Sequence, residues 1–215
     1  MIAVPRSRHV YVHGEAGRLE SVIEQAAQSR PRAVAVICHP HPLHGGSMDN
    51  KVVTTLSRTL SRQGALAIRF NYRGVGASEG GYDHGEGELA DALAIADWAL
   101  DEFGKDLPLV LAGFSFGGAI AYRAAAVRRT RALITVAPAS ERIPEQTPEP
   151  DCDWLLIQGT ADEIVSPMAV QEWIGTRVRR PEQVWLPDVG HFFHGQLGAL
   201  SAAVKAFAAL DRVAA

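Results

Sequence analysis

The sequence lacks the features that mark membrane-spanning, disulfide-stabilised and nucleic-acid-binding proteins. Its longest apolar stretches run for about six to eight residues, whereas a helix needs about twenty to cross a bilayer. Residues 1–12 contain no long apolar run, so we expect no signal peptide. No block of basic residues points to nucleic acid. Cys38 and Cys152 are the two cysteines, which argues against a disulfide framework and favours a reducing, cytoplasmic location.

The overall composition is that of an ordinary soluble globular protein. The formal net charge is -3 and the hydrophobic fraction is 47%. A chain of 215 residues is long enough for one domain with a buried core and a little short for two. We therefore expect residues 1–215 to form a single domain. The oligomeric state stays open, because nothing in the sequence demands an assembly.

Short apolar runs alternate with longer amphipathic segments along most of the chain. The predicted strands are 33–38, 65–68, 109–112, 133–136, 154–157 and 183–186. Continuous apolar runs are typical of strands that are buried on both faces of a parallel sheet. The predicted helices carry the apolar stripes Val52-Val53-Leu56-Leu60, Leu89-Leu93-Ala96-Leu100-Phe103 and Leu197-Leu200-Val204-Phe207-Leu210. This alternation predicts an α/β fold with helices on both faces of the sheet.

Two further segments depart from that alternation. Residues 9–12 and 19–23 flank a turn that contains Gly14 and Gly17, which predicts an antiparallel β-hairpin at the edge of the sheet. Residues 141–153 are rich in proline and charge, which predicts an exposed loop.

The most informative motif lies at residues 113–117, which read Gly-Phe-Ser-Phe-Gly and match the pattern G-x-S-x-G. The motif follows a predicted strand and precedes a predicted helix, which is the context of a nucleophile elbow. A serine on so tight a turn needs small neighbours. The N-terminus of the following helix then directs backbone N–H groups and a positive dipole toward the serine oxygen. We therefore predict that Ser115 is a nucleophile.

A nucleophilic serine needs a base, and the base needs a carboxylate that orients it. In a chain with this elbow the acid and then the histidine follow the serine. Of the two histidines after Ser115, we assign the base to His191, which lies in a loop directly after the strand 183–186. His194 is the alternative, interpreted as a loop or helix-cap residue. We assign the acid to Asp162, in the loop after the strand 154–157.

Two other carboxylates compete with Asp162 for the role of the acid. Glu163 is its immediate neighbour, and we expect its side chain to point elsewhere. Asp188 lies three residues before His191, and we expect it to shape the turn, because a carboxylate so close in sequence rarely reaches the correct ring nitrogen.

Acyl transfer also requires donors for the oxyanion. One is expected to be the backbone N–H of Phe116, directly after the nucleophile. The other should come from the loop at residues 39–46, where the prolines have no N–H to offer. We assign it to His41, with Leu43 as the alternative. Leu43, Phe114 and Phe192 are the expected substrate-binding side chains.

Two features near these loops invite other interpretations. His39, His41 and His44 are close in sequence, but no carboxylate or thiolate cluster joins them at ligand spacing, so we predict neither a metal nor another cofactor. The glycine-containing loop at residues 71–78 fits neither the phosphate-binding loop nor the dinucleotide fingerprint. We interpret Arg73 in that loop as an organiser of the loop rather than a substrate contact.

With these motifs in place, the chain resembles the α/β-hydrolase superfamily over nearly its full length. It looks most like the small, lidless bacterial serine hydrolases. The matching stretches are 39–46, 71–78, 113–118, 159–162 and 190–193. The resemblance implies a sheet of about eight strands in which the second is antiparallel. Dienelactone hydrolases are similar but carry a cysteine nucleophile, and Ser115 argues against their specific chemistry.

The resemblance also bears on the substrate. Larger members insert a cap domain after the strand 133–136, but here only about sixteen residues precede the next strand, so we expect no cap and an open site. The predicted function is hydrolysis of small or short-chain carboxylic esters through an acyl-enzyme on Ser115. A thioesterase, a peptidase with the same triad and a catalytically silent binding protein are the alternatives. The expected partner is a small ester-like molecule, with no nucleic acid and no membrane.

Overall fold

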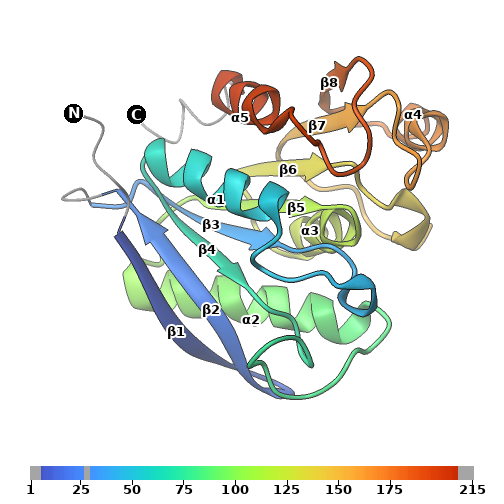
Figure 1. Ribbon diagram of the computed structural model, residues 1–215. Coiled ribbons are helices and arrows are strands. Elements are labelled where there is room, and N and C mark those ends of the chain that lie inside the picture. The colour runs from blue at the N-terminus through green and yellow to red at the C-terminus, as the bar shows by residue number, and fades with distance from the viewer. Residues whose placement is uncertain (1–5, 27–29, 208–215) are drawn as a thin grey trace.

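The computed structural model describes residues 6–26 and 30–207 (Figure 1). The strands are β1 (Arg6–Gly14), β2 (Gly17–Gln25), β3 (Ala33–Cys38), β4 (Ala65–Phe70), β5 (Leu109–Phe114), β6 (Ala132–Val136), β7 (Asp153–Gly159) and β8 (Glu182–Leu186). The α-helices are α1 (Lys51–Arg62), α2 (Glu86–Phe103), α3 (Phe116–Val127), α4 (Pro167–Gly175) and α5 (Leu197–Ala206), and the short 3-10 turns are η1 (Pro42–His44) and η2 (Ser140–Arg142). Within the described ranges, no helix is both long and apolar enough to cross a membrane.

The strands form one eight-stranded sheet in the order β1-β2-β4-β3-β5-β6-β7-β8. Strand β2 pairs antiparallel with both β1 and β4, and every pair from β4 to β8 is parallel. This arrangement confirms the predicted α/β-hydrolase sheet with an antiparallel second strand. The predicted hairpin is also confirmed, with Val12 opposite Leu19 in the β1–β2 register.

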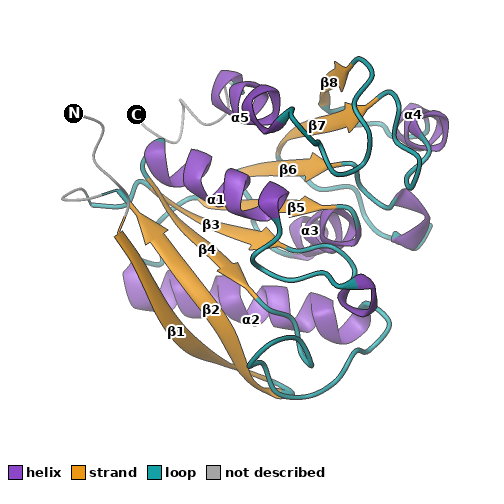
Figure 2. Ribbon diagram, in the orientation of Figure 1, coloured by secondary structure: helices purple, strands orange, loops and turns teal. Residues whose placement is uncertain are grey.

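Helices cover both faces of the sheet (Figure 2). Apolar residues of α1 and α5 pack in one core with Ala35 and Ile37 of β3, and those of α2, α3 and α4 pack in the other with Val34 and Val36. Successive residues of a strand face opposite sides of a sheet, so a strand with a core on each side must be apolar throughout. The continuous apolar runs follow from this burial.

The buried face of α2 differs from the predicted one. Ala96 of the predicted stripe is fully buried, but Leu89, Leu93, Leu100 and Phe103 are only partly buried, whereas Glu88, Asp91, Ala92, Ile95 and Ala99 are fully buried. The helix is therefore turned by about one residue from the predicted stripe. Small alanine side chains let α2 lie close to the sheet, and two buried carboxylates on the same face bind loop groups.

One of those carboxylates pairs with Arg73. Asp91 Oδ1 lies 2.8 Å from Arg73 Nη2, and Asp91 Oδ2 accepts the Arg73 backbone N–H at 2.9 Å. The hydrogen bonds that Arg73 donates to Asp91 raise the pKa of Arg73, against the opposing effect of burial. The pair joins the loop after β4 to α2, which confirms the interpretation of Arg73 as an organiser of its loop.

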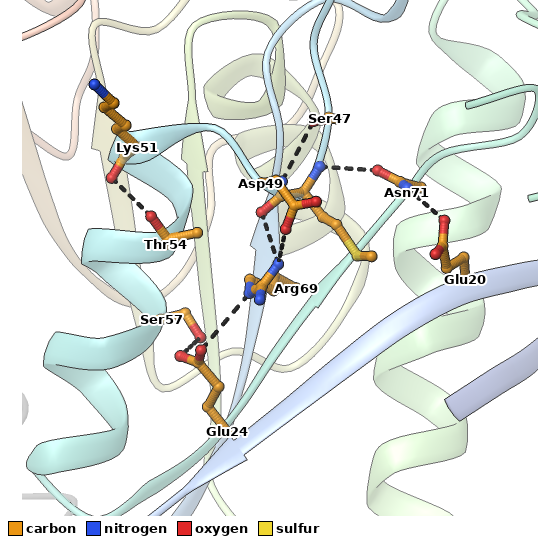
Figure 3. A network of polar contacts seen from close by, with 10 residues as sticks. Glu20, Glu24, Ser47, Asp49, Lys51, Thr54, Ser57, Arg69 and Asn71 are labelled. Carbon is orange, nitrogen blue, oxygen red and sulfur yellow. Dashed lines mark hydrogen bonds and ion pairs between the residues drawn. The ribbon is translucent and has the colours of Figure 1, made fainter. Parts of the chain in front are cut away.

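A second polar network holds the loop between β3 and α1, which carries His41 (Figure 3). Arg69 of β4 donates to the Asp49 carboxylate at 2.6 Å and to the Met48 carbonyl at 3.2 Å. The Met48 N–H in turn donates to Asn71 Oδ1 at 2.8 Å. The far end of the loop is thus tied to the end of β4.

We predict that Asp91→Asn lowers the free energy of unfolding by roughly 3 kcal/mol, because it removes the charge that the buried Arg73 guanidinium binds directly. Urea denaturation measures the change. Asp101→Asn is the matched control, because Asp101 of the same helix forms an exposed pair with Lys105, just beyond the helix end, and its loss should cost about 0.5 kcal/mol or less. Equal effects of the two substitutions would contradict the assigned role of the Arg73–Asp91 pair.

Candidate active site

Ser115 occupies the sharp turn between β5 and α3. Its backbone has φ 57 and ψ -120, a left-handed φ that costs a non-glycine residue energy. Hydrogen bonds hold the turn in place: Ser115 donates its N–H to the Val136 carbonyl at 2.9 Å, and its carbonyl accepts from Gly118 at 2.9 Å and from Ala139 at 3.1 Å. This is the geometry of a nucleophile elbow.

The two outer glycines of the motif are required by close backbone contacts. A Cβ on Gly113 would overlap the carbonyl of Gly117, and a Cβ on Gly117 would overlap the carbonyl of Cys38 at the end of β3. The first turn of α3 therefore packs directly against the end of β3. The Cys38 side chain is fully buried, and this burial raises the pKa of the thiol to about 12, so it stays protonated.

The structure brings Ser115, His191 and Asp162 together. Ser115 Oγ lies 3.1 Å from His191 Nε2, and His191 Nδ1 lies 2.8 Å from Asp162 Oδ2. All three side chains are buried, with 8%, 4% and 7% of the residue exposed. The three residues come from loops after β5, β8 and β7, which meet at one edge because the strands are parallel. A continuous hydrogen-bonded chain thus runs from a hydroxyl through an imidazole to a carboxylate.

Asp162 is held by donors on both oxygens. Its Oδ1 accepts the N–H groups of Ile164 at 2.9 Å and Val165 at 2.7 Å, and its Oδ2 accepts from His191 and from Gln158 Nε2, the latter at 3.0 Å. Burial alone would raise the pKa of Asp162, but the hydrogen bonds from His191 and the backbone outweigh it and lower that pKa. The carboxylate is therefore ionised at neutral pH.

The alternatives to this trio lie in other positions. The Glu163 carboxylate accepts the backbone N–H of His191 at 3.3 Å, so it supports the loop rather than the ring. Asp188 has a φ of 56 and donates its N–H to Thr160 Oγ1 at 3.0 Å, which shapes the turn before the histidine. His194 is exposed and its ring lies against Phe192.

The loop after β3 is organised by a buried histidine. His39 Nδ1 donates to the Pro40 carbonyl at 2.6 Å, and His39 Nε2 accepts the backbone N–H of Tyr72 at 3.1 Å. Burial lowers the pKa of His39 from 6.5 to about 3, so the ring is neutral. His39 thereby links the start of the loop that carries His41 to the loop after β4.

His41 and Phe116, the predicted oxyanion donors, lie side by side. Their rings are 4.9 Å apart, and Phe116 is the first residue of α3, where backbone N–H groups have no partner within the helix. His41 Nδ1 accepts the N–H of Leu43 at 3.2 Å, and His41 Nε2 lies 3.3 Å from the Tyr82 hydroxyl. Burial, then nearby His44 and Arg142, lower the pKa of His41.

The three predicted substrate-binding residues differ in placement. Leu43 is 67% exposed and Phe192 is 46% exposed, and both are in loops that carry the site. Phe114 is fully buried, with its ring 4.9 Å from that of His191 and 6.3 Å from that of Phe193. The prediction that Phe114 contacts substrate is therefore wrong. As the last residue of the central strand β5, Phe114 faces the core, and its ring packs against the imidazole of His191.

Sequence reasoning missed two residues of the site. Tyr82 reaches the predicted oxyanion loop from the segment before α2, and Gln158 reaches Asp162 from the end of β7. A polar glutamine at the end of the apolar strand that leads to Asp162 was the available signal for Gln158. Nothing in the sequence around Tyr82 marks it. In residues 6–26 and 30–207, no three histidine, cysteine or acidic residues come together to hold a metal ion.

This fold and this arrangement of side chains define an α/β serine hydrolase. The family described as Serine aminopeptidase, S33 (Hydrolase_4), matches residues 29–151, more than half of the chain. The chain belongs to this family of α/β hydrolases. The matched region contains Ser115 and the predicted oxyanion loop and ends before Asp162.

Two solved structures of similar sequence agree with this assignment. A lidless α/β serine hydrolase from Xanthomonas campestris is 39% identical, with a TM-score of 0.89 over 96% of this chain and 94% of that one. An α/β serine hydrolase homologue from Coxiella burnetii is 37% identical, with a TM-score of 0.86 over 92% of this chain and 96% of that one.

A relative found by sequence, an uncharacterized protein of Rickettsia prowazekii, is 41% identical over 113 residues. These residues are 52% of this chain and 47% of that protein, so the alignment spans about half the length of the relative.

A more distant structure shares the fold alone. Est1E from Butyrivibrio proteoclasticus, whose structure contains ferulic acid, is 19% identical, with a TM-score of 0.84 over 96% of this chain and 100% of that one.

We predict that His39 makes the protein sensitive to acid. The pKa of His39 is about 3 in the folded protein and has the ordinary value of 6.5 in the unfolded chain. Below pH 6.5, His39 is therefore protonated in the unfolded chain but stays neutral in the folded protein. The contribution of neutral His39 to the free energy of unfolding is therefore complete above pH 6.5 and is lost as the pH falls toward 3. Between pH 6.5 and 5 the loss should be about 1.5 kcal/mol.

Urea denaturation at several pH values measures this slope. His39→Gln should be less stable at pH 7 but should lose less further stability on acidification. His194→Gln is the control, because His194 is exposed and its substitution should leave the slope unchanged. The same slope in wild type and His39→Gln would overturn the assignment.

Proposed function

We propose that the protein hydrolyses carboxylic esters through an acyl-enzyme on Ser115, with His191 as general base and Asp162 as the acid that orients it. The observation that carries this proposal is the pair of hydrogen bonds from Ser115 Oγ to His191 Nε2 at 3.1 Å and from His191 Nδ1 to Asp162 Oδ2 at 2.8 Å. These distances suit proton transfer from the hydroxyl to the imidazole.

In the proposed reaction, Ser115 Oγ attacks the ester carbonyl while His191 Nε2 takes the hydroxyl proton. Ionised Asp162 holds the ring in the tautomer with a proton on Nδ1 and stabilises the imidazolium. The backbone N–H groups of Phe116 and His41 stabilise the tetrahedral oxyanion. His191 returns the proton to the leaving alkoxide, and a water that it then activates releases the acid. No metal or cofactor enters these steps.

The proposed substrate is a small or short-chain ester. Between β6 and β7 the chain contains only the short turn η2, so no helical cap covers the site from that side. Leu43 and Phe192 offer exposed apolar surface beside the catalytic loops. The free thiols of Cys38 and Cys152 support a reducing compartment, and we place the activity in the cytoplasm.

A second candidate is an aminopeptidase, which the description of the matching family favours. The same three residues could cleave an amide, or a thioester, because each reaction needs a nucleophile, a base and an oxyanion site. The substrate's leaving group separates these activities, so the test must compare esters, thioesters and amides directly.

We predict that the wild-type protein hydrolyses p-nitrophenyl acetate and butyrate faster than the octanoate, and amino-acid p-nitroanilides slowest. Ser115→Ala should lower kcat/KM by at least about 10⁴-fold, because the covalent route is lost. Steady-state kinetics over this panel and a matched acyl-thioester measure the preference.

The two histidines after Ser115 supply a matched pair of variants. His191→Gln should be as inactive as Ser115→Ala, and His194→Gln should keep wild-type kcat/KM. Preferential cleavage of the nitroanilides would replace the esterase with the aminopeptidase. Turnover that survives in Ser115→Ala would overturn the proposed nucleophile.

A further inference from the structure

Gln158 is a buried polar residue at the end of β7. Strand alternation places its side chain on the same face as Trp154 and Leu156, which belong to the apolar core shared with α3 and α4. The residue has no exposed surface. An amide in such surroundings is destabilising unless it is hydrogen-bonded, so its presence calls for a specific partner.

The contacts of the amide define which atom is needed. Gln158 Nε2 lies 3.0 Å from Asp162 Oδ2, 3.3 Å from the Val165 carbonyl and 3.4 Å from the Gly159 carbonyl. In the described part of the chain, Gln158 Oε1 has no hydrogen-bond partner. A flipped amide would direct that oxygen at three acceptors, so the environment fixes the orientation with the donor toward Asp162. The site therefore requires a donor rather than any polar group.

The same oxygen of Asp162 also accepts the proton on His191 Nδ1, at 2.8 Å. We propose that Gln158 is a positioning residue of the catalytic relay. Gln158 holds Asp162 Oδ2 in line with His191 and weakens the electrostatic effect of the Asp162 charge on the imidazole. This inference rests on the proposed function, because it assigns Gln158 a role in the relay that activates Ser115. The backbone donors of Ile164 and Val165 hold the other oxygen and cannot replace it.

The titratable neighbours of Asp162 are few. His191 bonds it directly, and the Glu163 carboxylate accepts the His191 backbone N–H. Around Gln158, α4 contributes Val170 to the surrounding core, and the neighbouring strand β8 places Trp185 opposite Gln158 in register. Neither of these two side chains titrates, so an acidic group introduced at position 158 would interact mainly with Asp162 and His191.

Two substitutions separate the donor from the shape of the side chain. Gln158→Met keeps the length and removes the donor, so the negative charge of Asp162 acts on His191 unopposed. His191 should then titrate at a pH higher by about 0.5. The value of kcat/KM for p-nitrophenyl acetate should fall about tenfold, through kcat rather than KM.

Gln158→Glu tests the same point in the opposite direction. While the introduced carboxyl is protonated, its O–H can donate to Asp162 Oδ2 as the amide does, so activity should stay near wild type. Once it ionises, two carboxylates face each other in a buried site, and kcat/KM should fall as the pH rises. A residue that only fills space would not produce this reversal with pH.

The titration of His191 is followed by NMR of ¹⁵N-labelled histidine, and kcat/KM is measured over the same pH range. Gln171→Met is the control, because Gln171 is an exposed glutamine on α4, and both readouts should match wild type. Thermal unfolding verifies that each variant is folded.

An unchanged His191 titration in folded Gln158→Met, or a pH profile of Gln158→Glu that matches wild type, would overturn the role of Gln158. If neither variant folds, Gln158 serves the core and the inference is also overturned. If the wild-type protein shows no ester turnover while His191 still shifts in Gln158→Met, the proposed function fails and the coupling of Gln158 to the relay stands.

Discussion

The close approach of the first turn of α3 to the end of β3 is the constraint on which the site depends. Glycine at 117 permits it, because a Cβ there would overlap the backbone of Cys38, and glycine at 113 lets the same turn lie close to β5. The residue between the two glycines, Ser115, has a left-handed backbone conformation with φ 57. Its Oγ then lies within hydrogen-bond distance of His191, while the N-terminal N–H groups of α3 face the same edge of the sheet.

The parallel sheet supplies the remaining groups at that edge. Loops after β3, β5, β7 and β8 carry His41, Ser115, Asp162 and His191, which lie far apart in sequence. Separate interactions hold two of these loops: His39 and the Arg69 network hold the loop after β3, and hydrogen bonds to Asp162 hold the loop after β7. The relay is thus assembled before any substrate binds, which reduces the reorganisation that the reaction requires.

Much of this arrangement could be predicted from the sequence, because local rules and global fold agree at those positions. The apolar runs predicted the parallel strands, and the glycine spacing around Ser115 predicted the elbow. The order of Ser115, Asp162 and His191 along the chain predicted the trio that the structure brings within hydrogen-bond distance. The first two of these signals lie in short stretches of chain, where spacing alone carries the information.

The features that escaped prediction depend on contacts between distant segments. The buried face of α2 is turned because Asp91 binds Arg73 across the sheet edge, which an apolar stripe cannot reveal. Phe114 sits next to the nucleophile in sequence, yet strand alternation directs it under His191 and away from solvent. The role of Gln158 becomes evident only in the folded structure, where the loop after β7 places Asp162 Oδ2 3.0 Å from Gln158 Nε2.

The most direct test of the central claim is reaction with a fluorophosphonate, followed by intact mass and peptide mapping. An activated serine attacks this reagent and an ordinary buried hydroxyl does not. The account predicts one adduct per chain, on Ser115, with no adduct in Ser115→Ala. Folded wild-type protein that forms no adduct, or forms one at another residue, would contradict the claim that the hydrogen bonds through His191 to Asp162 activate Ser115.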